Sequence, residues 1–257
     1  MQDIKKNDKN EMTPMAGTWS EVTISGKRAD VYEPARPAGH GRGVVHLHGH
    51  GLKTLKDDEV FSAELERHGL RAVCPHGARS WWLDVVCPEF DERVTPLAFL
   101  REQLLPWIEQ HWQLSPPQIG LMGLCMGGQG VLQLAYRSPS EFPVVAAICP
   151  VIDFHQWHGH AIPLTEMFES AEAARQQTAI LQILPLHWPR HQLLLCDPDD
   201  AYFAGVERLA GKLSSSGVPY ESDFETTGGG HCWEYCRTVA GRAVQHVADG
   251  LEAINAE

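Results

Sequence analysis

The chain has 257 residues, of which 43% are hydrophobic and 21% are charged, a composition that suits a globular protein with a sizeable core. Its formal net charge of -12 excludes a nucleic acid or an anionic membrane as the main partner, because both require concentrated positive charge. We therefore expect a small-molecule partner, and the formation of a homodimer stays open.

The N-terminal segment and the cysteines bear on where the protein works. Residues 1–16 are polar and lysine-rich, which predicts a disordered tail rather than a secretory signal. No later apolar run is long enough to cross a membrane, so we expect a cytoplasmic protein with one domain over residues 17–257. Seven cysteines in a chain of this length do not indicate disulfides. Cys74, Cys149 and Cys196 lie in apolar runs and are predicted to be buried thiols.

Short apolar runs alternate with helical patterns along the chain. Residues 18–24 and 29–32 are predicted to form a hairpin. Four strand–helix units follow, at residues 44–48 and 57–68, 71–74 and 96–111, 119–122 and 127–137, and 193–196 and 202–215. A further strand is predicted at residues 220–226, and helical spacing predicts a last helix from residue 240 to 254. The alternation predicts an α/β fold with a mostly parallel sheet covered by helices on both faces.

The regular pattern fails between residues 151 and 190, where His, Trp, Pro and Glu accumulate without a clear period. In a parallel sheet, loops at the carboxyl edge are the usual place for contacts with a substrate. We therefore interpret residues 151–190 as a lid-like insertion over that edge.

The strongest chemical signal is a glycine-rich turn around Cys125. A predicted strand runs into Gly-x-Cys-x-Gly-Gly, and a helical pattern follows. Small neighbours let the strand and the helix approach so closely that the side chain at the tip is lifted out of the sheet. At a helix N-terminus the peptide dipoles favour a thiolate. The turn predicts that Cys125 is a nucleophile, and the alternative is a buried thiol without chemical meaning.

Candidates for a base and an acid lie in the C-terminal third of the chain. His231 follows three glycines just before the last helical region, and Asp-Pro-Asp-Asp, residues 197–200, follows a predicted strand. A nucleophile needs a nearby base and a third group that orients the base. We predict His231 as the base and Asp200 as the acid, with Asp197 as its rival; the acids not used would form a solvated turn.

The sequence His-Leu-His-Gly-His-Gly, residues 46–51, ends the strand predicted at residues 44–48. The backbone N–H groups of His50 and Met126 are predicted to form an oxyanion hole. The competing interpretation is a zinc site built from the clustered histidines, which are His46, His48, His50, His155, His158 and His160. Because Gly49 bends the chain and no aspartate follows closely, we expect no metal, and catalysis by the predicted Cys125, His231 and Asp200 needs no cofactor.

Two adjacent tryptophans, Trp81 and Trp82, interrupt the unit that follows the strand predicted at residues 71–74. They are predicted to wall an apolar acyl pocket, with Arg79 or Asp84 supplying polarity. Simple packing in the core is the alternative.

Taken together, these residues resemble the α/β-hydrolase superfamily over most of the chain. The stretch GLMGLCMGGQGVLQLAYRSP, residues 120–139, is similar to the nucleophile region of esterase D and S-formylglutathione hydrolase-type esterases, which carry serine where this chain has Cys125. A cysteine at this position is instead similar to dienelactone hydrolase, whose Cys-His-Asp triad opens a lactone. The resemblance implies an α/β-hydrolase fold and a carboxylesterase-like enzyme that cleaves a small ester, lactone or thioester without a cofactor. A weakly active or inactive relative that only binds a ligand is the alternative.

Overall fold

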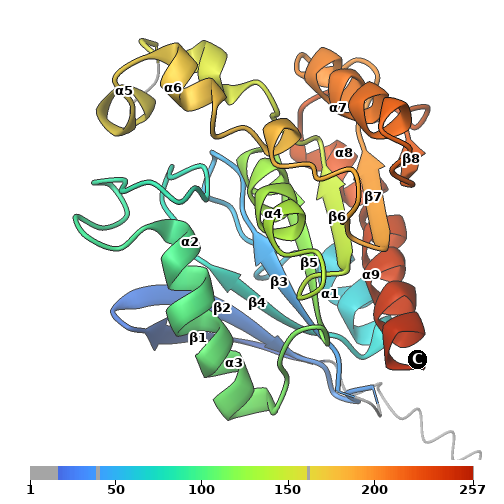
Figure 1. The fold of residues 1–257 in the computed structure, drawn as a ribbon. Coiled ribbons are helices and arrows are strands. Elements are labelled where there is room, and N and C mark those ends of the chain that lie inside the picture. The colour runs from blue at the N-terminus through green and yellow to red at the C-terminus, as the bar shows by residue number, and fades with distance from the viewer. Residues whose placement is uncertain (1–16, 39–40, 161–162, 257) are drawn as a thin grey trace, which may run out of the picture.

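The computed structural model describes residues 17–38, 41–160 and 163–256, so the tail predicted for residues 1–16 lies outside the described residues. Eight strands form one central sheet (Figure 1). They are β1 (Thr18–Ile24), β2 (Lys27–Glu33), β3 (Gly43–Leu47), β4 (Arg71–Pro75), β5 (Ile119–Leu124), β6 (Val144–Ile148), β7 (His191–Leu195) and β8 (Glu221–Asp223).

The strand order is β1-β2-β4-β3-β5-β6-β7-β8. The pairs β1–β2 and β2–β4 are antiparallel, whereas all pairs from β4 to β8 are parallel. Parallel strands end at the same edge of a sheet, so the loops that follow β3, β5, β6 and β7 gather there. This topology confirms the predicted mostly parallel α/β sheet.

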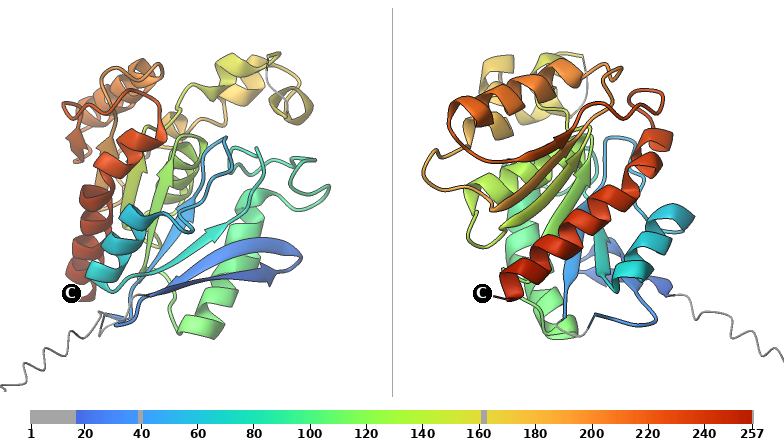
Figure 2. Two further views of the ribbon diagram at one scale, coloured as in Figure 1. Left: turned by 180° about the vertical axis from the view of Figure 1, so that it is seen from behind. Right: turned by 90° about the vertical axis from the view of Figure 1, so that its right-hand side faces the viewer.

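Helices cover both faces of the sheet. The helical segments are α1 (Glu59–His68), α2 (Pro96–Phe99), η1 (Leu100–Leu104), α3 (Leu105–Trp112), α4 (Met126–Arg137), η2 (Phe154–Trp157), α5 (Leu164–Met167), α6 (Ala171–Arg175), η3 (Ala179–Leu181), α7 (Phe203–Ser215), α8 (Trp233–Thr238) and α9 (Ala240–Asn255). Figure 2 shows α1 and α9 side by side on one face, with α4 on the other. None of the helices in the described ranges is long and apolar enough to cross a membrane.

Two hydrophobic clusters fill the space between the helices and the sheet. Side chains alternate between the faces along a strand, so in β3 Val44 belongs to the cluster under α1 and α9, and Val45 belongs to the cluster under α4. Strands buried on both faces read as continuous apolar runs. That is why the central strands stand out in the sequence.

Two predicted elements change their form in the structure. The helix predicted at residues 96–111 is interrupted by the π-helical segment η1, where the N–H of Leu105 donates to the carbonyl of Leu100; Pro106, next in the chain, has no N–H to donate. The strand predicted at residues 220–226 stops at Asp223. Its carboxylate accepts the N–H groups of Glu225 and Thr226, which turns the chain away from the sheet.

The segment expected to form a lid-like insertion, residues 151–190, carries the short helices η2, α5, α6 and η3 between β6 and β7. In Figure 1 these helices lie at the same end of the molecule as α7 and α8. Phe154, Leu164, Ala174 and Ala179 are buried in the same cluster as α4. The segment is therefore packed onto the domain through an apolar underside.

The close approach of β5 and α4 depends on glycine. A Cβ atom added to Gly127 would lie 1.9 Å from the carbonyl oxygen of Leu47, and one added to Gly123 would lie 2.3 Å from the carbonyl oxygen of Gly127. Both contacts are with backbone, which cannot swing aside. The turn between β5 and α4 therefore excludes any larger residue at these two positions.

We predict that Gly127→Ala lowers the free energy of unfolding by about 1–3 kcal/mol or more, as overpacking of a core does. Gly211→Ala is the matched control, because Gly211 is exposed in α7 and an added Cβ meets nothing within 4 Å. That change should stabilise the protein by up to about 1 kcal/mol through helix propensity. Denaturant unfolding of both variants tests the pair, and equal unfolding midpoints would contradict the packing argument.

Candidate active site

Cys125 occupies the sharp turn between β5 and α4. Its backbone has φ 56° and ψ -119°, a strained conformation for a residue with a side chain. The surrounding backbone holds it there, because the N–H of Cys125 donates to the carbonyl of Ile148 at 2.9 Å and its carbonyl accepts the N–H groups of Gln129 and Val151. The thiol side chain is consequently directed into a cavity at the carboxyl edge of the sheet.

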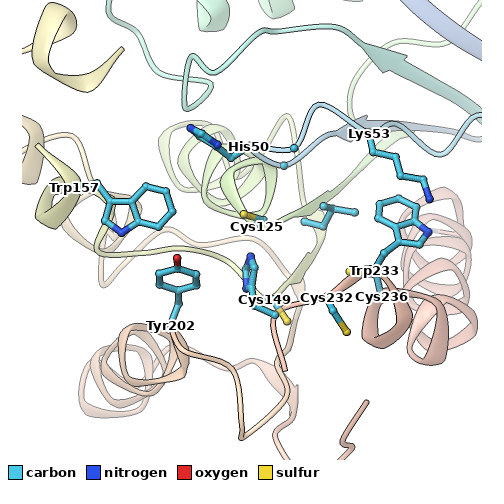
Figure 3. A pocket seen from close by; sticks show the side chains of 13 residues that line it. His50, Lys53, Cys125, Cys149, Trp157, Tyr202, Cys232, Trp233 and Cys236 are labelled. Atoms are coloured by element: carbon cyan, nitrogen blue, oxygen red, sulfur yellow. The ribbon is translucent and has the colours of Figure 1, made fainter. Parts of the chain in front are cut away.

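The cavity has a volume of about 250 Å³, and its wall is mostly apolar (Figure 3). Its lining residues are Gly49, His50, Gly51, Lys53, Leu124, Cys125, Cys149, Trp157, Tyr202, His231, Cys232, Trp233 and Cys236. In Figure 3, Cys125 lies between Trp157 and Tyr202 on one side and Lys53 and Trp233 on the other. A ligand in the cavity would thus have an aromatic wall on each side of the thiol.

His231 and Asp200 meet beside Cys125. The Nδ1 atom of His231 lies 2.7 Å from Oδ2 of Asp200, whose side chain is fully buried. Asp200 also accepts the N–H of Tyr202 at 2.7 Å. His231 follows Gly229 and Gly230, which have φ values of 94° and 78° that favour glycine. The loop after β7 and the loop after β8 are thereby brought together at the sheet edge.

The electrostatics of this group favour a protonated imidazole. Burial lowers the pKa of His231, but hydrogen bonds to Asp200 and Cys125 and the charges of these groups outweigh burial and raise the pKa to about 10. Burial raises the pKa of Asp200, yet hydrogen bonds from His231, Tyr202 and Cys149 bring it below the ordinary value. At neutral pH Asp200 is therefore a carboxylate and His231 an imidazolium.

Asp197, the rival acid, has different partners. Its buried carboxylate accepts the N–H groups of Gly228 at 2.7 Å, Gly230 at 2.8 Å and Asp199 at 2.8 Å. Burial raises the pKa of Asp197, and these N–H groups lower it to a net value below the ordinary range. Asp197 holds the glycine loop that leads into His231, while Asp199 is exposed.

The two residues expected to supply oxyanion donors flank Cys125. Met126 is the first residue of α4, so its N–H has no acceptor within the helix. His50 lines the cavity, and a Cβ added to its neighbour Gly49 would lie 2.9 Å from Cβ of Cys125. The ring of His50 packs against Trp81 and Trp157, and burial lowers its pKa. The loop after β3 therefore passes directly beside the turn.

The prediction that Trp81 and Trp82 wall the pocket is wrong. Both side chains are 0% exposed and neither lines the cavity. Both residues have positive φ values, 57° and 55°, in a turn that directs the rings inward. Trp81 stacks on Phe154 with ring centroids 4.8 Å apart, and Nε1 of Trp82 donates to the carbonyl of His48 at 3.1 Å.

The polar neighbours of these tryptophans are also engaged elsewhere, since Arg79 forms an ion pair with Glu89 and Asp84 accepts the hydroxyl of Thr95. The aromatic rings that do line the cavity are Trp157, Tyr202 and Trp233. For two of them the sequence held a signal, which is closeness along the chain to a predicted site residue. Tyr202 follows Asp200 by two positions, and Trp233 follows His231 by two positions.

The histidines that suggested a zinc site are not brought together in the described part of the chain. Among the described residues, no three of them bring ring nitrogens within 4.8 Å of one another. His46 is fully buried, and burial lowers its pKa to about 3. His48 instead makes two contacts with backbone, at 2.8 Å to the carbonyl of Gly49 and at 3.0 Å to the N–H of Gly77. His46 lies within β3, whereas His48 and His50 belong to the loop that follows the end of β3 at Leu47.

We predict that Asp200→Asn lowers the pKa of His231 from about 10 toward its ordinary value of 6.5, because the mutation removes a negative charge and a hydrogen-bond acceptor. NMR titration of the imidazole protons measures this directly. Asp199→Asn is the control, since Asp199 is exposed and has no bond to His231, and it should leave the titration unchanged. An unaltered pKa in Asp200→Asn would show that Asp200 is not the group that raises it.

Several solved structures of hydrolases share the fold of this chain. An S-formylglutathione hydrolase from Agrobacterium tumefaciens superposes with a TM-score of 0.71 at 17% identity, over 91% of this chain and 94% of that one. An S-formylglutathione hydrolase from Staphylococcus aureus gives 0.72 at 14% identity, over 91% and 98%. A fluorophosphonate-binding serine hydrolase from Staphylococcus aureus gives 0.68 at 16% identity, over 91% and 99%. These similarities confirm the α/β-hydrolase fold.

A search of curated protein sequences found no significant match. The family model named Esterase, with the description "Putative esterase", matches residues 31–238. The match extends from β2 to the end of α8, and it includes the turn at Cys125 and the loops of Asp200 and His231. The chain belongs to the Esterase family of α/β-hydrolases.

Proposed function

We propose that the protein is an esterase in which Cys125 attacks the carbonyl of a small-molecule carboxylic ester. The observation that carries the proposal is the 2.7 Å contact between His231 and Asp200 beside the strained Cys125 turn. The candidate nucleophile and the candidate base therefore line one cavity, and Asp200, which contacts the imidazole, is the acid that would orient the base. Membership in the Esterase family supports the same class of reaction.

In the proposed mechanism, His231 holds the proton of Cys125 and the thiolate attacks the ester carbonyl carbon. The N–H groups of His50 and Met126 stabilise the oxyanion of the tetrahedral intermediate. Collapse of the intermediate breaks the ester bond, and the imidazolium gives its proton to the leaving alkoxide. Water, deprotonated by His231, then attacks the thioester and releases the carboxylic acid and the thiol.

The presence of a cysteine at position 125, where related enzymes have a serine, affects which substrates the site can cleave. A thiolate is a strong nucleophile, and esters, thioesters and lactones have leaving groups that depart from its tetrahedral intermediate more readily than an amine does. The apolar rings of Trp157, Tyr202 and Trp233 favour apolar groups on the ester. A screen of p-nitrophenyl esters of graded chain length, with a thioester and a dienelactone alongside, tests which class is preferred.

We predict that Cys125→Ala abolishes ester hydrolysis and the rapid alkylation by iodoacetamide but leaves the fold intact, because the thiol points into a cavity. Cys125→Ser should keep or raise ester turnover if the site retains the geometry of serine hydrolases. Cys87→Ala, which changes a buried thiol that does not line the cavity, is the control and should remain active. Hydrolysis that survives in Cys125→Ala would move the nucleophile elsewhere and refute the proposal. If an activated ester gives no initial burst of product, the protein would instead be a relative that binds a ligand without hydrolysing it.

We further predict that Asp200→Asn lowers kcat/KM by up to about 10⁴-fold, the loss found when the acid of a serine triad is altered. Asp197→Asn should affect mainly stability, because an amide cannot accept all three N–H groups that Asp197 holds. Asp199→Asn should change little. Kinetics and denaturant unfolding of the three variants separate these effects, and a greater loss of kcat/KM in Asp197→Asn would reassign the acid.

A further inference from the structure

A second group of reactive side chains lies behind the proposed site. Cys149 follows β6 and Cys196 follows β7, and these strands are parallel neighbours with Ile148 in register with Leu195. The two cysteines therefore leave the sheet side by side, and the N–H of Cys149 donates to the carbonyl of Leu195 at 2.7 Å. The Sγ atoms of both cysteines and a carboxylate oxygen of Asp200 all lie within 4.8 Å of one another, and all three residues are buried.

Two sulfurs and one oxygen are a donor set for thiophilic divalent cations. Zinc binds thiolate sulfur at about 2.3 Å and carboxylate oxygen at about 2.0–2.2 Å, so two sulfurs on one ion lie less than about 4.6 Å apart. The spacing of Cys149, Cys196 and Asp200 is already on that scale. Three protein ligands also leave the fourth tetrahedral position for water.

The group is accessible from the cavity. Cys149 lines the cavity together with Cys125, as Figure 3 shows, whereas Cys196 and Asp200 are buried and do not line it. An ion that enters the cavity therefore reaches Cys149 first. No backbone rearrangement of β6 or β7 is required, because both cysteines already sit at the carboxyl ends of their strands.

We propose that Cys149, Cys196 and Asp200 form an inhibitory site for Zn²⁺ or a similarly thiophilic divalent cation. On binding, the two thiols each release a proton to water and two metal–sulfur bonds form, with no transfer of electrons. The carboxylate of Asp200 becomes a metal ligand and loses its hydrogen bond to His231. The binding site stands on this geometry alone, while its inhibitory effect rests on the proposed function.

Binding is tested on full-length Cys125→Ala, in which the nucleophile cannot serve as a ligand. Zn²⁺ affinity is measured by competition with a chromophoric chelator, and Cd²⁺ reports the number of thiolate ligands through its ultraviolet charge-transfer band. We expect one ion per chain with two thiolates. Adding Cys196→Ser should weaken Zn²⁺ binding by more than the about 10- to 100-fold that loss of an outer-shell partner costs, and should halve the Cd²⁺ band. Cys149→Ser should weaken Zn²⁺ binding and halve the Cd²⁺ band in the same way, and it replaces Cys196→Ser in the test if that variant fails to fold.

Cys236→Ala in the same background is the matched control, because Cys236 is a buried thiol of the same cavity outside the group. It should bind Zn²⁺ as tightly as Cys125→Ala. The proposal is overturned if Cys125→Ala alone abolishes binding, since the ion would then belong to Cys125 and His231, or if Cys196→Ser and Cys149→Ser bind as tightly as the parent. In the chain with Cys125 intact, Zn²⁺ should inhibit ester hydrolysis, and Cys196→Ser should resist it. A chain without esterase activity would refute the proposed function but leave the binding result intact.

Discussion

The contact between the first turn of α4 and the end of β3 is the constraint on which the site depends. Gly127 lies so close to the carbonyl of Leu47 that no side chain fits between them. This approach forces the chain at Cys125 into positive φ, and hydrogen bonds to neighbouring backbone hold it there. The strain is local, whereas the packing that stabilises it comes from strands on both sides. The thiol therefore has a fixed direction, and the loop after β3 passes beside it.

Two aspartates on one loop divide two tasks that a single acid could not perform. Asp197 accepts three backbone N–H groups and so fixes the glycine loop before His231, whereas Asp200 contacts the imidazole itself. Both carboxylates are buried, and burial alone would favour their neutral forms. Hydrogen bonds to the charged form reverse that preference in each case. The position of His231 thus depends on a carboxylate that does not touch its ring.

Sulfur is unusually abundant around the same cavity. Four of the seven cysteines, which are Cys125, Cys149, Cys232 and Cys236, line it, and Cys196 lies directly behind. Cys149 also has a positive φ, 43°, but Cys125 combines its strained turn with the contact to His231 that suits a nucleophile. The other thiols are small apolar groups in packing terms, but the position of Cys149 and Cys196 beside Asp200 would make this residue sensitive to an ion that binds their sulfurs. The proposed chemistry and the proposed metal site therefore share one residue.

The sequence by itself determined the strand–helix alternation and the turn at Cys125, because apolar runs and the spacing of glycines are local properties of the chain. It also restricted the candidates for a base and an acid to two short loops. Only the tertiary structure decided that Asp200 rather than Asp197 contacts His231, since that depends on how two loops from neighbouring strands meet. The structure also contains β6, which was absent from the predicted strand–helix units. Trp81 and Trp82 are buried in it, whereas Trp157 lines the cavity. Trp81 and Trp82 have positive φ values, and their rings contact Phe154 and His48, which are distant in sequence. No local pattern records such contacts.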